Sequence, residues 1–193
     1  MSDFNPDNHN ELQVRTTKIP GLLAFDLPVH GDNRGWFKEN YQREKLVKLG
    51  LPEDFEIVQN NISYNEKAGV TRGIHAEPWD KYISIGFGSV FAAIVDLRDG
   101  DTFGVVETFE LNPGQAIYVP RGCGNSFQTL EDHTVYTYLV NEHWSPEAKY
   151  LLVNLADEDI AIDWPIALEQ AEVSDKDKNH PKLKDINAWR SDE

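Results

Sequence analysis

Two short apolar runs joined by glycines decide the fold, because residues 82–95 read YISIGFGSVFAAIV. Both runs are rich in β-branched and aromatic side chains, which favour strands, and the Gly-Phe-Gly sequence at 86–88 is typical of a turn. Similar runs recur at intervals of about 8–12 residues between Leu22 and Trp164, the spacing of an antiparallel sandwich or barrel. They cover residues 56–58, 105–111, 116–119, 126–130, 134–140 and 150–153.

One helix is predicted among these strands, from about Gln42 to Leu49. Leu46 and Leu49 fall on one side of it, and Gly50 follows where a helix commonly ends. Strands and helices do not alternate along the chain, which excludes a doubly wound parallel sheet. The pattern therefore predicts an all-β fold with few helices.

The length of 193 residues suits one domain with a substantial core. We expect a flexible N-terminal arm over residues 1–11, a β-domain over 12–170 and a charged C-terminal tail over 171–193. The charge run from Glu172 to His180 is typical of a solvated segment. Leu183, Ile186 and Trp189 recur at intervals of three, which predicts a short helix that packs back on the domain.

Charge and composition exclude several classes of partner. The 18 basic and 33 acidic residues give a net charge of -15, which repels nucleic acids. No apolar run approaches the ~18 residues of a membrane span, and the polar N-terminus does not resemble a secretory signal. The single cysteine, Cys123, excludes an intrachain disulfide and fits a reducing cytoplasm.

Candidate polar residues concentrate in three places: at 30–40, at 59–63 followed by 70–78, and at Tyr136 and Tyr138 with the later Asp157. On a regular strand Arg72 and His75 face opposite sides, but a bulge at Gly73 would bring both into one cavity. From its position alone, a lone histidine at a strand end such as His75 is more often a structural residue than a catalyst. Tyr136 and Tyr138 share a face, and by themselves two such tyrosines are more typical of core aromatics than of catalytic residues.

The residue pattern gives little support to a metal site or a nucleotide-binding loop. His75 has one nearby carboxylate, Glu77, whereas a metal site in a β-sandwich would need two closely spaced histidines, a carboxylate and another histidine. His133 and His143 lie ten residues apart on a later stretch. Neither the dinucleotide-binding nor the P-loop glycine pattern is present in the sequence.

Taken in order, several motifs resemble the dTDP-4-dehydrorhamnose 3,5-epimerase family over about residues 20–165. They are GDNRGWFKE at 31–39, QNNIS at 59–63, RGIH at 72–75, VDLR at 95–98 with TFG at 102–104, VPRG at 119–122 before Phe127, and Asp157 followed by IDWP at 162–165. The resemblance implies a cupin-like, jelly-roll antiparallel β-sandwich that forms a homodimer and uses no metal or cofactor. It also implies epimerisation at C3 and C5 of a dTDP-linked 4-keto-6-deoxyhexose, on the route to dTDP-L-rhamnose and rhamnose-containing polysaccharide.

The resemblance also implies roles for particular residues. His75 matches the base, Asp157 the carboxylate that orients it, Lys81 the group that stabilises the enolate, and Tyr138 the proton donor on the opposite face. One of the arginines that hold the pyrophosphate is expected to come from the partner subunit. The substrate-contacting positions correspond to Arg34, Glu39, Gln59, Asn61, Arg72, Asn125 and Lys149.

The chain departs from the family pattern at Asn125, where many members have histidine, and in the short loop between His75 and Lys81. Three alternatives to a double epimerase stay open on the sequence. The first is a related enzyme that inverts one carbon only or moves the keto group. The second is a sugar-nucleotide-binding cupin without catalysis, and the third is a metal-dependent cupin oxygenase.

Overall fold

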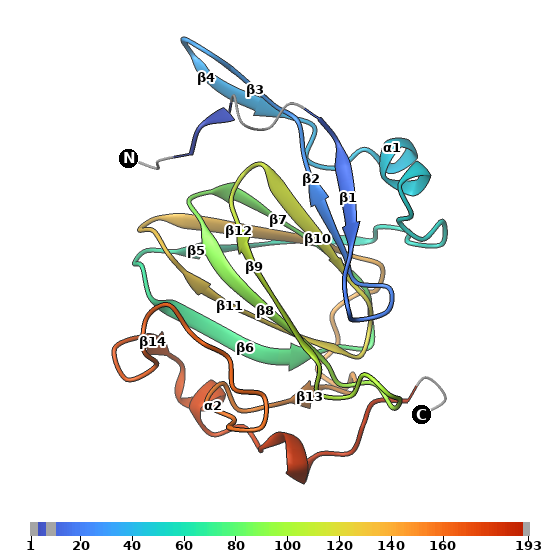
Figure 1. Ribbon diagram of the computed structural model, residues 1–193, viewed down its shortest axis with the longest axis vertical. Helices are drawn as coiled ribbons and strands as arrows, with labels where there is room; N and C mark the ends of the chain where they lie inside the picture. Colours follow the sequence, from blue (N-terminus) through green and yellow to red (C-terminus); the bar gives the residue numbers. More distant parts are fainter. Residues whose placement is uncertain (1–3, 7–10, 191–193) are drawn as a thin grey trace.

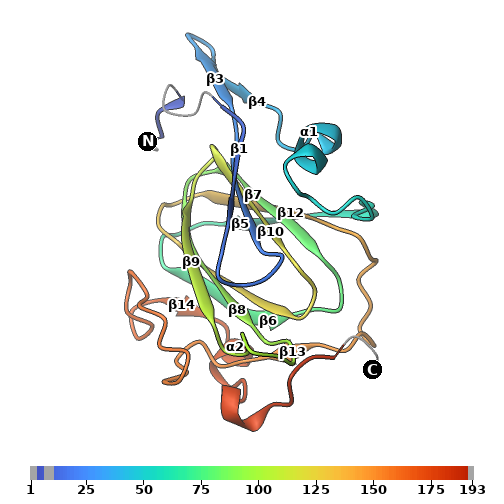
Figure 2. The ribbon, with the colours of Figure 1, turned by 45° about the vertical axis from the view of Figure 1, so that its right-hand side comes forward.

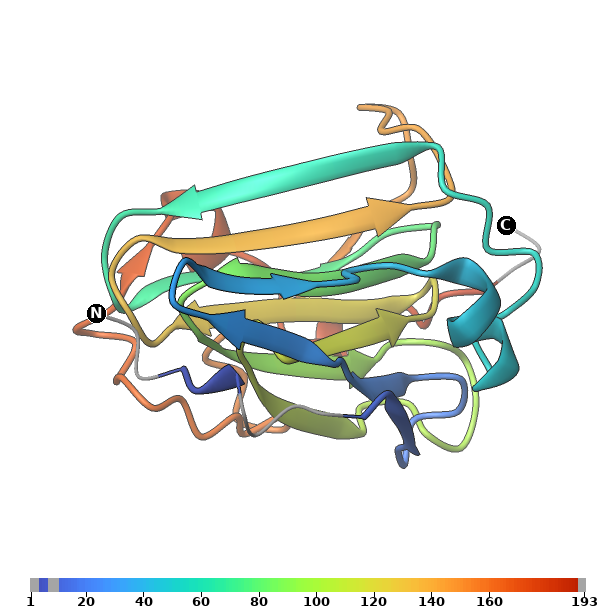
Figure 3. The ribbon, with the colours of Figure 1, turned by 90° about the horizontal axis from the view of Figure 1, so that it is seen from above.

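The computed structural model describes residues 4–6 and 11–190, which form two stacked β-sheets (Figures 1 and 3). The first sheet has the order β1 (Gln13–Thr16), β2 (Leu23–Asp26), β10 (Gln115–Val119), β7 (Lys81–Phe87), β12 (Thr134–Val140) and β5 (Gln59–Asn65). The second has the order β13 (Leu151–Leu152), β6 (Val70–Ala76), β11 (Cys123–Thr129), β8 (Val90–Asp96) and β9 (Val106–Leu111). Neighbours within both orders pair antiparallel, which confirms the predicted β-sandwich.

The core lies between the sheets and is supplied by the alternating apolar positions of the strands. Ile83 and Ile85 from β7 meet Ala92 and Ile94 from β8, and none of the four is exposed to solvent. Removing this apolar area from water is the main stabilising contribution to a sandwich. The apolar runs at 82–85 and 90–95 therefore supply facing strands in the two sheets.

The predicted helix is present as α1 (Arg43–Lys48). The side chain of Gln42 caps it by accepting a hydrogen bond from the Lys45 backbone N–H at 2.7 Å. Leu46 is its buried anchor, and Gly50 ends it with a φ of 108°, which suits glycine.

A hairpin of β3 (Val29–Asp32) and β4 (Gly35–Lys38) projects from one end of the sandwich (Figures 1 and 2). Trp36 and Phe37 on this hairpin are 37% and 64% exposed. The predicted arm over residues 1–11 lies largely outside the described residues.

The C-terminal segment runs along the second sheet (Figure 1). β14 (Glu172–Val173) pairs parallel with β6, α2 (Asp175–Lys178) follows, and a 3₁₀ turn covers Leu183–Asp185. The expectation of a solvated charge run does not hold for Asp177, which is 6% exposed. Among the residues described, no helix is long and apolar enough to cross a membrane.

Candidate active site

A cavity of about 440 Å³ opens between β5 and β12 of the first sheet and β6 of the second. The C-terminal segment contributes residues of α2 and its flanks to the lining. Side chains from both sheets and from α2 line it: Gln59, Asn61, Arg72, His75, Glu77, Trp79, Tyr138, Val140, Trp144, Tyr150, Leu152, Ser174, Lys176, Asp177 and His180.

An irregularity at Gly73 places two of the predicted residues in this cavity. On β11, Phe127 pairs with Arg72 and Asn125 pairs with His75. Between these two pairs β6 advances by three residues and β11 by two, so β6 contains one extra residue. The extra residue cancels the strand alternation, and Arg72 and His75 both line the cavity as predicted. Only glycine fits here, because φ is 128° and a Cβ on Gly73 would lie 2.3 Å from the Cβ of Ser126.

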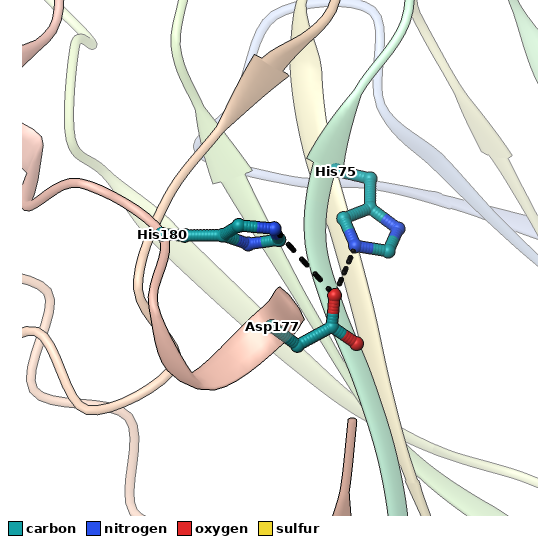
Figure 4. A group of neighbouring side chains, drawn as sticks. All are labelled: His75, Asp177 and His180. Atoms are coloured by element: carbon teal, nitrogen blue, oxygen red, sulfur yellow. Dashed lines mark hydrogen bonds and ion pairs between the residues drawn. The ribbon is translucent and has the colours of Figure 1, made fainter. Parts of the chain in front are cut away.

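His75 and Asp177 both line the cavity and form a hydrogen-bonded pair (Figure 4). Nε2 of His75 lies 2.8 Å from Oδ1 of Asp177, and the two side chains are 34% and 9% exposed. Burial alone raises the pKa of Asp177, but the hydrogen bond and charge of His75 outweigh it and lower the pKa overall. The ionised carboxylate accepts the Nε2–H, which leaves Nδ1 with a free electron pair and the ability to take a proton.

The prediction that Asp157 orients His75 is wrong in this structure. The Asp157 carboxylate accepts hydrogen bonds from the backbone N–H groups of Asp159, Ile160 and Leu183 at 2.8–3.1 Å. It therefore organises the loop after β13 and does not line the cavity. One sequence signal could have pointed to Asp177: Ser174 precedes it by three positions, which is the spacing of a helix cap, and the Ser174 hydroxyl accepts from the Asp177 N–H at 3.1 Å.

Tyr138 and Lys81 adjoin the cavity from the first sheet, opposite β6. The Lys81 ammonium lies 5.6 Å from the centre of the Tyr138 ring and forms an ion pair with Glu77. Burial and then the nearby Glu77 carboxylate raise the pKa of Tyr138, so its phenol stays protonated at neutral pH. Tyr138 lines the cavity, whereas Lys81 is 4% exposed and lies behind Tyr138 and Glu77, outside the lining.

Three of the predicted substrate-binding residues line the cavity. Gln59 and Asn61 on β5 are joined by a side-chain hydrogen bond of 2.8 Å. Arg72 donates a hydrogen bond from Nε to Oδ1 of Asn65 at 3.2 Å. These amide and guanidinium groups supply the donors that phosphate and hydroxyl oxygens need.

The other four predicted contacts lie outside the cavity lining. Asn125 is engaged behind it, where its side-chain oxygen accepts from the Tyr136 hydroxyl at 3.1 Å. Lys149 is exposed, directly before the cavity residue Tyr150. Arg34 pairs with Asp32 at the tip of the β3–β4 hairpin, and Glu39 pairs with Lys45 beside α1.

An aromatic wall of the cavity was not predicted from the sequence. Trp79 and Tyr150 meet edge to face with ring centres 5.7 Å apart, and Trp144 is 61% exposed at the rim. Flat apolar surfaces of this kind suit the faces of a sugar ring or a nucleobase.

His180 is a second histidine beside the His75–Asp177 pair (Figure 4). Its Nε2 lies 3.7 Å from Oδ1 of Asp177, and its ring centre lies 5.5 Å from that of His75. Burial and then the neighbouring His75 lower the pKa of His180, which favours the neutral imidazole. Within the described part of the chain, these three residues are the group whose donor atoms could hold a metal ion.

Comparisons with known proteins agree with this geometry. Residues 16–185 match the sequence profile of a family described as dTDP-4-dehydrorhamnose 3,5-epimerase. A protein of Streptococcus pyogenes serotype M6 named Protein RmlC homolog is 51% identical over 175 residues, which are 88% of each chain. The dTDP-4-dehydrorhamnose 3,5-epimerase of Pseudomonas aeruginosa is 32% identical over 178 residues, 89% of this chain and 96% of that one.

A solved structure shows the same architecture. RmlC from Streptococcus suis, in complex with dTDP-D-xylose, is 50% identical and superposes with a TM-score of 0.90 over 94% of this chain and 96% of that one. This likeness confirms the expected cupin-like jelly roll.

Proposed function

Because this chain belongs to the dTDP-4-dehydrorhamnose 3,5-epimerase family, we propose that it inverts C3 and C5 of dTDP-4-dehydro-6-deoxy-D-glucose to give dTDP-4-dehydro-L-rhamnose. It is an isomerase of the dTDP-L-rhamnose route to cell-surface polysaccharide. The observation that carries the proposal is the His75–Asp177 pair in a cavity that Tyr138 lines from the opposite sheet.

The first step is removal of the proton on the carbon next to the C4 ketone. Nδ1 of His75 takes this proton, the C–H electrons form a carbon–carbon double bond, and the negative charge moves to the C4 oxygen. Asp177 stabilises the resulting imidazolium, and the Lys81 ammonium stabilises the enolate oxygen. The adjacent ketone itself makes the proton acidic, so these side chains suffice for the chemistry.

The second step returns a proton from the other face of the ring. The Tyr138 hydroxyl gives its proton to the carbon, the enolate electrons return to that carbon, and the ketone forms again with the centre inverted. His75 then loses its proton to solvent and Tyr138 regains one from solvent. Repetition at the second carbon completes the double epimerisation, and both new C–H hydrogens come from water.

The nucleotide end of the substrate fits the polar side of the cavity. Arg72 offers its guanidinium to the pyrophosphate, and Gln59 and Asn61 offer amide groups to neighbouring oxygens. The Streptococcus suis relative binds dTDP-D-xylose, which supports a dTDP-linked sugar as the ligand here. We assign Asn125 and Lys149 supporting positions around this contact.

We further propose a homodimer in which the partner completes each site. Arg34 and Glu39 lie on or next to the β3–β4 hairpin, away from the cavity of their own chain. The hairpin exposes Phe37, and the edge strand β5 exposes Ile62 and Tyr64 at 68% and 58%. Exposed apolar side chains on an edge strand and a projecting hairpin suit burial against a second copy, which would carry Arg34 to the other cavity.

A cytoplasmic location follows from the same proposal. Nucleotide sugars are built and consumed where nucleotides are available, and the buried Cys123 thiol fits a reducing compartment.

The docked C-terminal segment is proposed to be part of the catalytic domain, because it supplies Asp177 to the cavity.

The test is to incubate the protein with dTDP-4-dehydro-6-deoxy-D-glucose in deuterated water and to follow the sugar by NMR. We expect deuterium at C3 and C5 and the L-rhamno configuration in the product. Inversion at one carbon alone would identify a single-site epimerase, and movement of the carbonyl to C3 a ketoisomerase. Tight dTDP-sugar binding without exchange would identify a non-catalytic binding protein.

A further inference from the structure

His180 lies inside the cavity, yet the proposed reaction gives it no part. It follows α2 by two residues, and its side chain is 9% exposed. It faces the same Asp177 oxygen that accepts the hydrogen bond from His75 (Figure 4). Two imidazoles therefore converge on one carboxylate, an arrangement that proton transfer by a single base does not require.

The spacing of the three side chains matches the needs of a small metal ion. One nitrogen or oxygen from each of His75, Asp177 and His180 lies within 4.8 Å of the others. The distances to Oδ1 of Asp177 are 2.8 Å from His75 and 3.7 Å from His180. Zinc binds nitrogen and oxygen at about 2.0–2.2 Å, so ligand atoms that share a tetrahedral zinc lie ~3.3 Å apart. The two distances bracket that value, and small rotations of the rings would satisfy it.

We propose that His75, Asp177 and His180 form a binding site for a divalent transition-metal ion, with Zn²⁺ as its best ligand, and that the bound ion inhibits the enzyme. Two imidazoles and one carboxylate favour Zn²⁺, Co²⁺ and Ni²⁺ over Mg²⁺ and Ca²⁺, which prefer sets of oxygen ligands. His75 is 34% exposed to the cavity, so the fourth coordination position is open to water or substrate.

Inhibition follows from which nitrogen the ion would occupy. Nε2 of His75 points at Asp177, so an ion shared with Asp177 takes the Nε2 electron pair. The ring proton then resides on Nδ1, because a neutral imidazole carries one N–H. The nitrogen that serves as the base loses its free electron pair, and proton abstraction stops. This consequence rests on the proposed function, whereas metal binding does not.

The binding test measures the ion directly, without the sugar substrate. Zn²⁺ is titrated calorimetrically into the full-length protein, and Co²⁺ binding is followed by its visible absorption. The variants are His180→Gln and His180→Ala, and the matched control is His30→Ala, which removes an exposed histidine on the β3–β4 hairpin. Thermal unfolding of each variant shows whether it is folded.

We expect the wild type and His30→Ala to bind one ion per chain at the cluster with equal affinity. Loss of one protein ligand in His180→Gln should weaken this binding at least tenfold and remove the Co²⁺ absorption bands of a tetrahedral site. Mg²⁺ should not compete with Zn²⁺ for this cluster. Equal Zn²⁺ affinity in the wild type and a folded His180 variant would overturn the site.

The activity test uses solvent deuterium exchange into the sugar with and without Zn²⁺. Wild-type exchange should be inhibited by Zn²⁺ and restored by EDTA, and the His180→Gln enzyme should need at least tenfold more Zn²⁺ for half-inhibition of its own rate. Zn²⁺ that binds the cluster without slowing exchange would contradict the inhibition and leave the site standing. An absence of exchange in the metal-free wild type would count against the proposed function, and calorimetry would still decide the metal site.

Discussion

Nε2 of His75 lies 2.8 Å from Oδ1 of Asp177, although 102 positions separate the two residues in the chain. β6 supplies the histidine, and α2 in the C-terminal segment supplies the carboxylate. Pairing of β14 with β6 and the Ser174 cap hold α2 in place. The base is therefore assembled only when the C-terminal segment docks on the second sheet.

The first prediction concerns Gly73, which creates the bulge. Gly73→Ala should lower the free energy of unfolding by about 2–5 kcal/mol, because the added Cβ combines unfavourable φ with a collision against Ser126. The same change should displace His75 and reduce the exchange rate. Urea titration and the NMR exchange assay measure the two effects.

Gly35→Ala is the matched control, because Gly35 has a similar φ of 134° and no atom within 4 Å of an added Cβ. Gly35→Ala should lower the free energy of unfolding by about 1–3 kcal/mol, which is the cost of the unfavourable φ alone. Equal stability losses in the two variants would show that close approach to Ser126 does not matter.

The second prediction separates the two tyrosines of β12. Tyr138→Phe removes the proposed donor from the cavity, so inversion should slow by about 10²–10⁴-fold. Tyr136 is buried behind the cavity and stacks on Phe127 with ring centres 4.1 Å apart. Tyr136→Phe should cost about 1 kcal/mol of stability through its lost hydrogen bond and keep the rate within a few-fold. Steady-state assays in which Tyr136→Phe is the slower enzyme would contradict the assignment.

The third prediction tests whether Arg34 acts across the dimer. Arg34→Ala and His75→Ala should each be inactive alone. In a heterodimer of the two, one cavity has both the intact His75 and the partner chain with intact Arg34. Random exchange of subunits should therefore restore about a quarter of wild-type activity, since half of the dimers are mixed and each has one complete site.

The control for this complementation mixes Arg34→Ala with a double variant that lacks Arg34 and His75, and it should stay inactive. If Arg34→Ala is fully active alone, or if mixing restores nothing, the shared site is wrong. Light scattering on each mixture checks that dimers are present.

The fourth prediction concerns acid stability through Asp96, on β8. Its carboxylate accepts hydrogen bonds from Arg98 and Thr102, each at 2.8 Å. Burial alone raises the pKa of Asp96, but these bonds outweigh it and hold the pKa below its usual value. A lowered folded-state pKa adds stability above the unfolded pKa, and the stability is lost as the pH falls through the folded pKa.

We therefore expect the free energy of unfolding to decline between about pH 5 and about pH 2. Asp96→Asn should be less stable at pH 7 and should show a shallower decline in urea titrations across this range. An equally steep decline in the variant would mean that other groups cause the acid sensitivity.

The strands and α1 could be predicted because they depend on local patterns. Alternating apolar side chains mark β7 and β8, and the positions of Leu46 and Gly50 mark the helix and its end. The bulge could also be predicted, because Gly73 lies between Arg72 and His75. Only an irregular strand can direct both of these side chains to the same side.

The partner of His75 could not be predicted in the same way. Asp177 stands in a charge run, and local sequence gives no sign that β14 pairs with β6 and buries it. Asp157 lies near the end of the stretch that carries the family resemblance, which is why it was predicted as the partner of His75. Its carboxylate accepts hydrogen bonds from three backbone N–H groups and does not contact His75. The positions of Arg34 and Glu39 depend on a hairpin that leaves the body of the chain, which spacing along the sequence does not reveal.

The most direct test of the account compares Asp177→Asn with Asp157→Asn in the deuterium exchange assay. We predict that Asp177→Asn lowers the exchange rate by about 10³–10⁴-fold while the variant still binds dTDP. The reason is that asparagine cannot stabilise the imidazolium of His75 as a carboxylate does. Asp157→Asn should lose stability and keep its exchange rate within tenfold when assayed below its unfolding temperature. Wild-type exchange in Asp177→Asn, with the loss found in a folded Asp157→Asn enzyme, would contradict the pairing of His75 with Asp177 as the catalytic base.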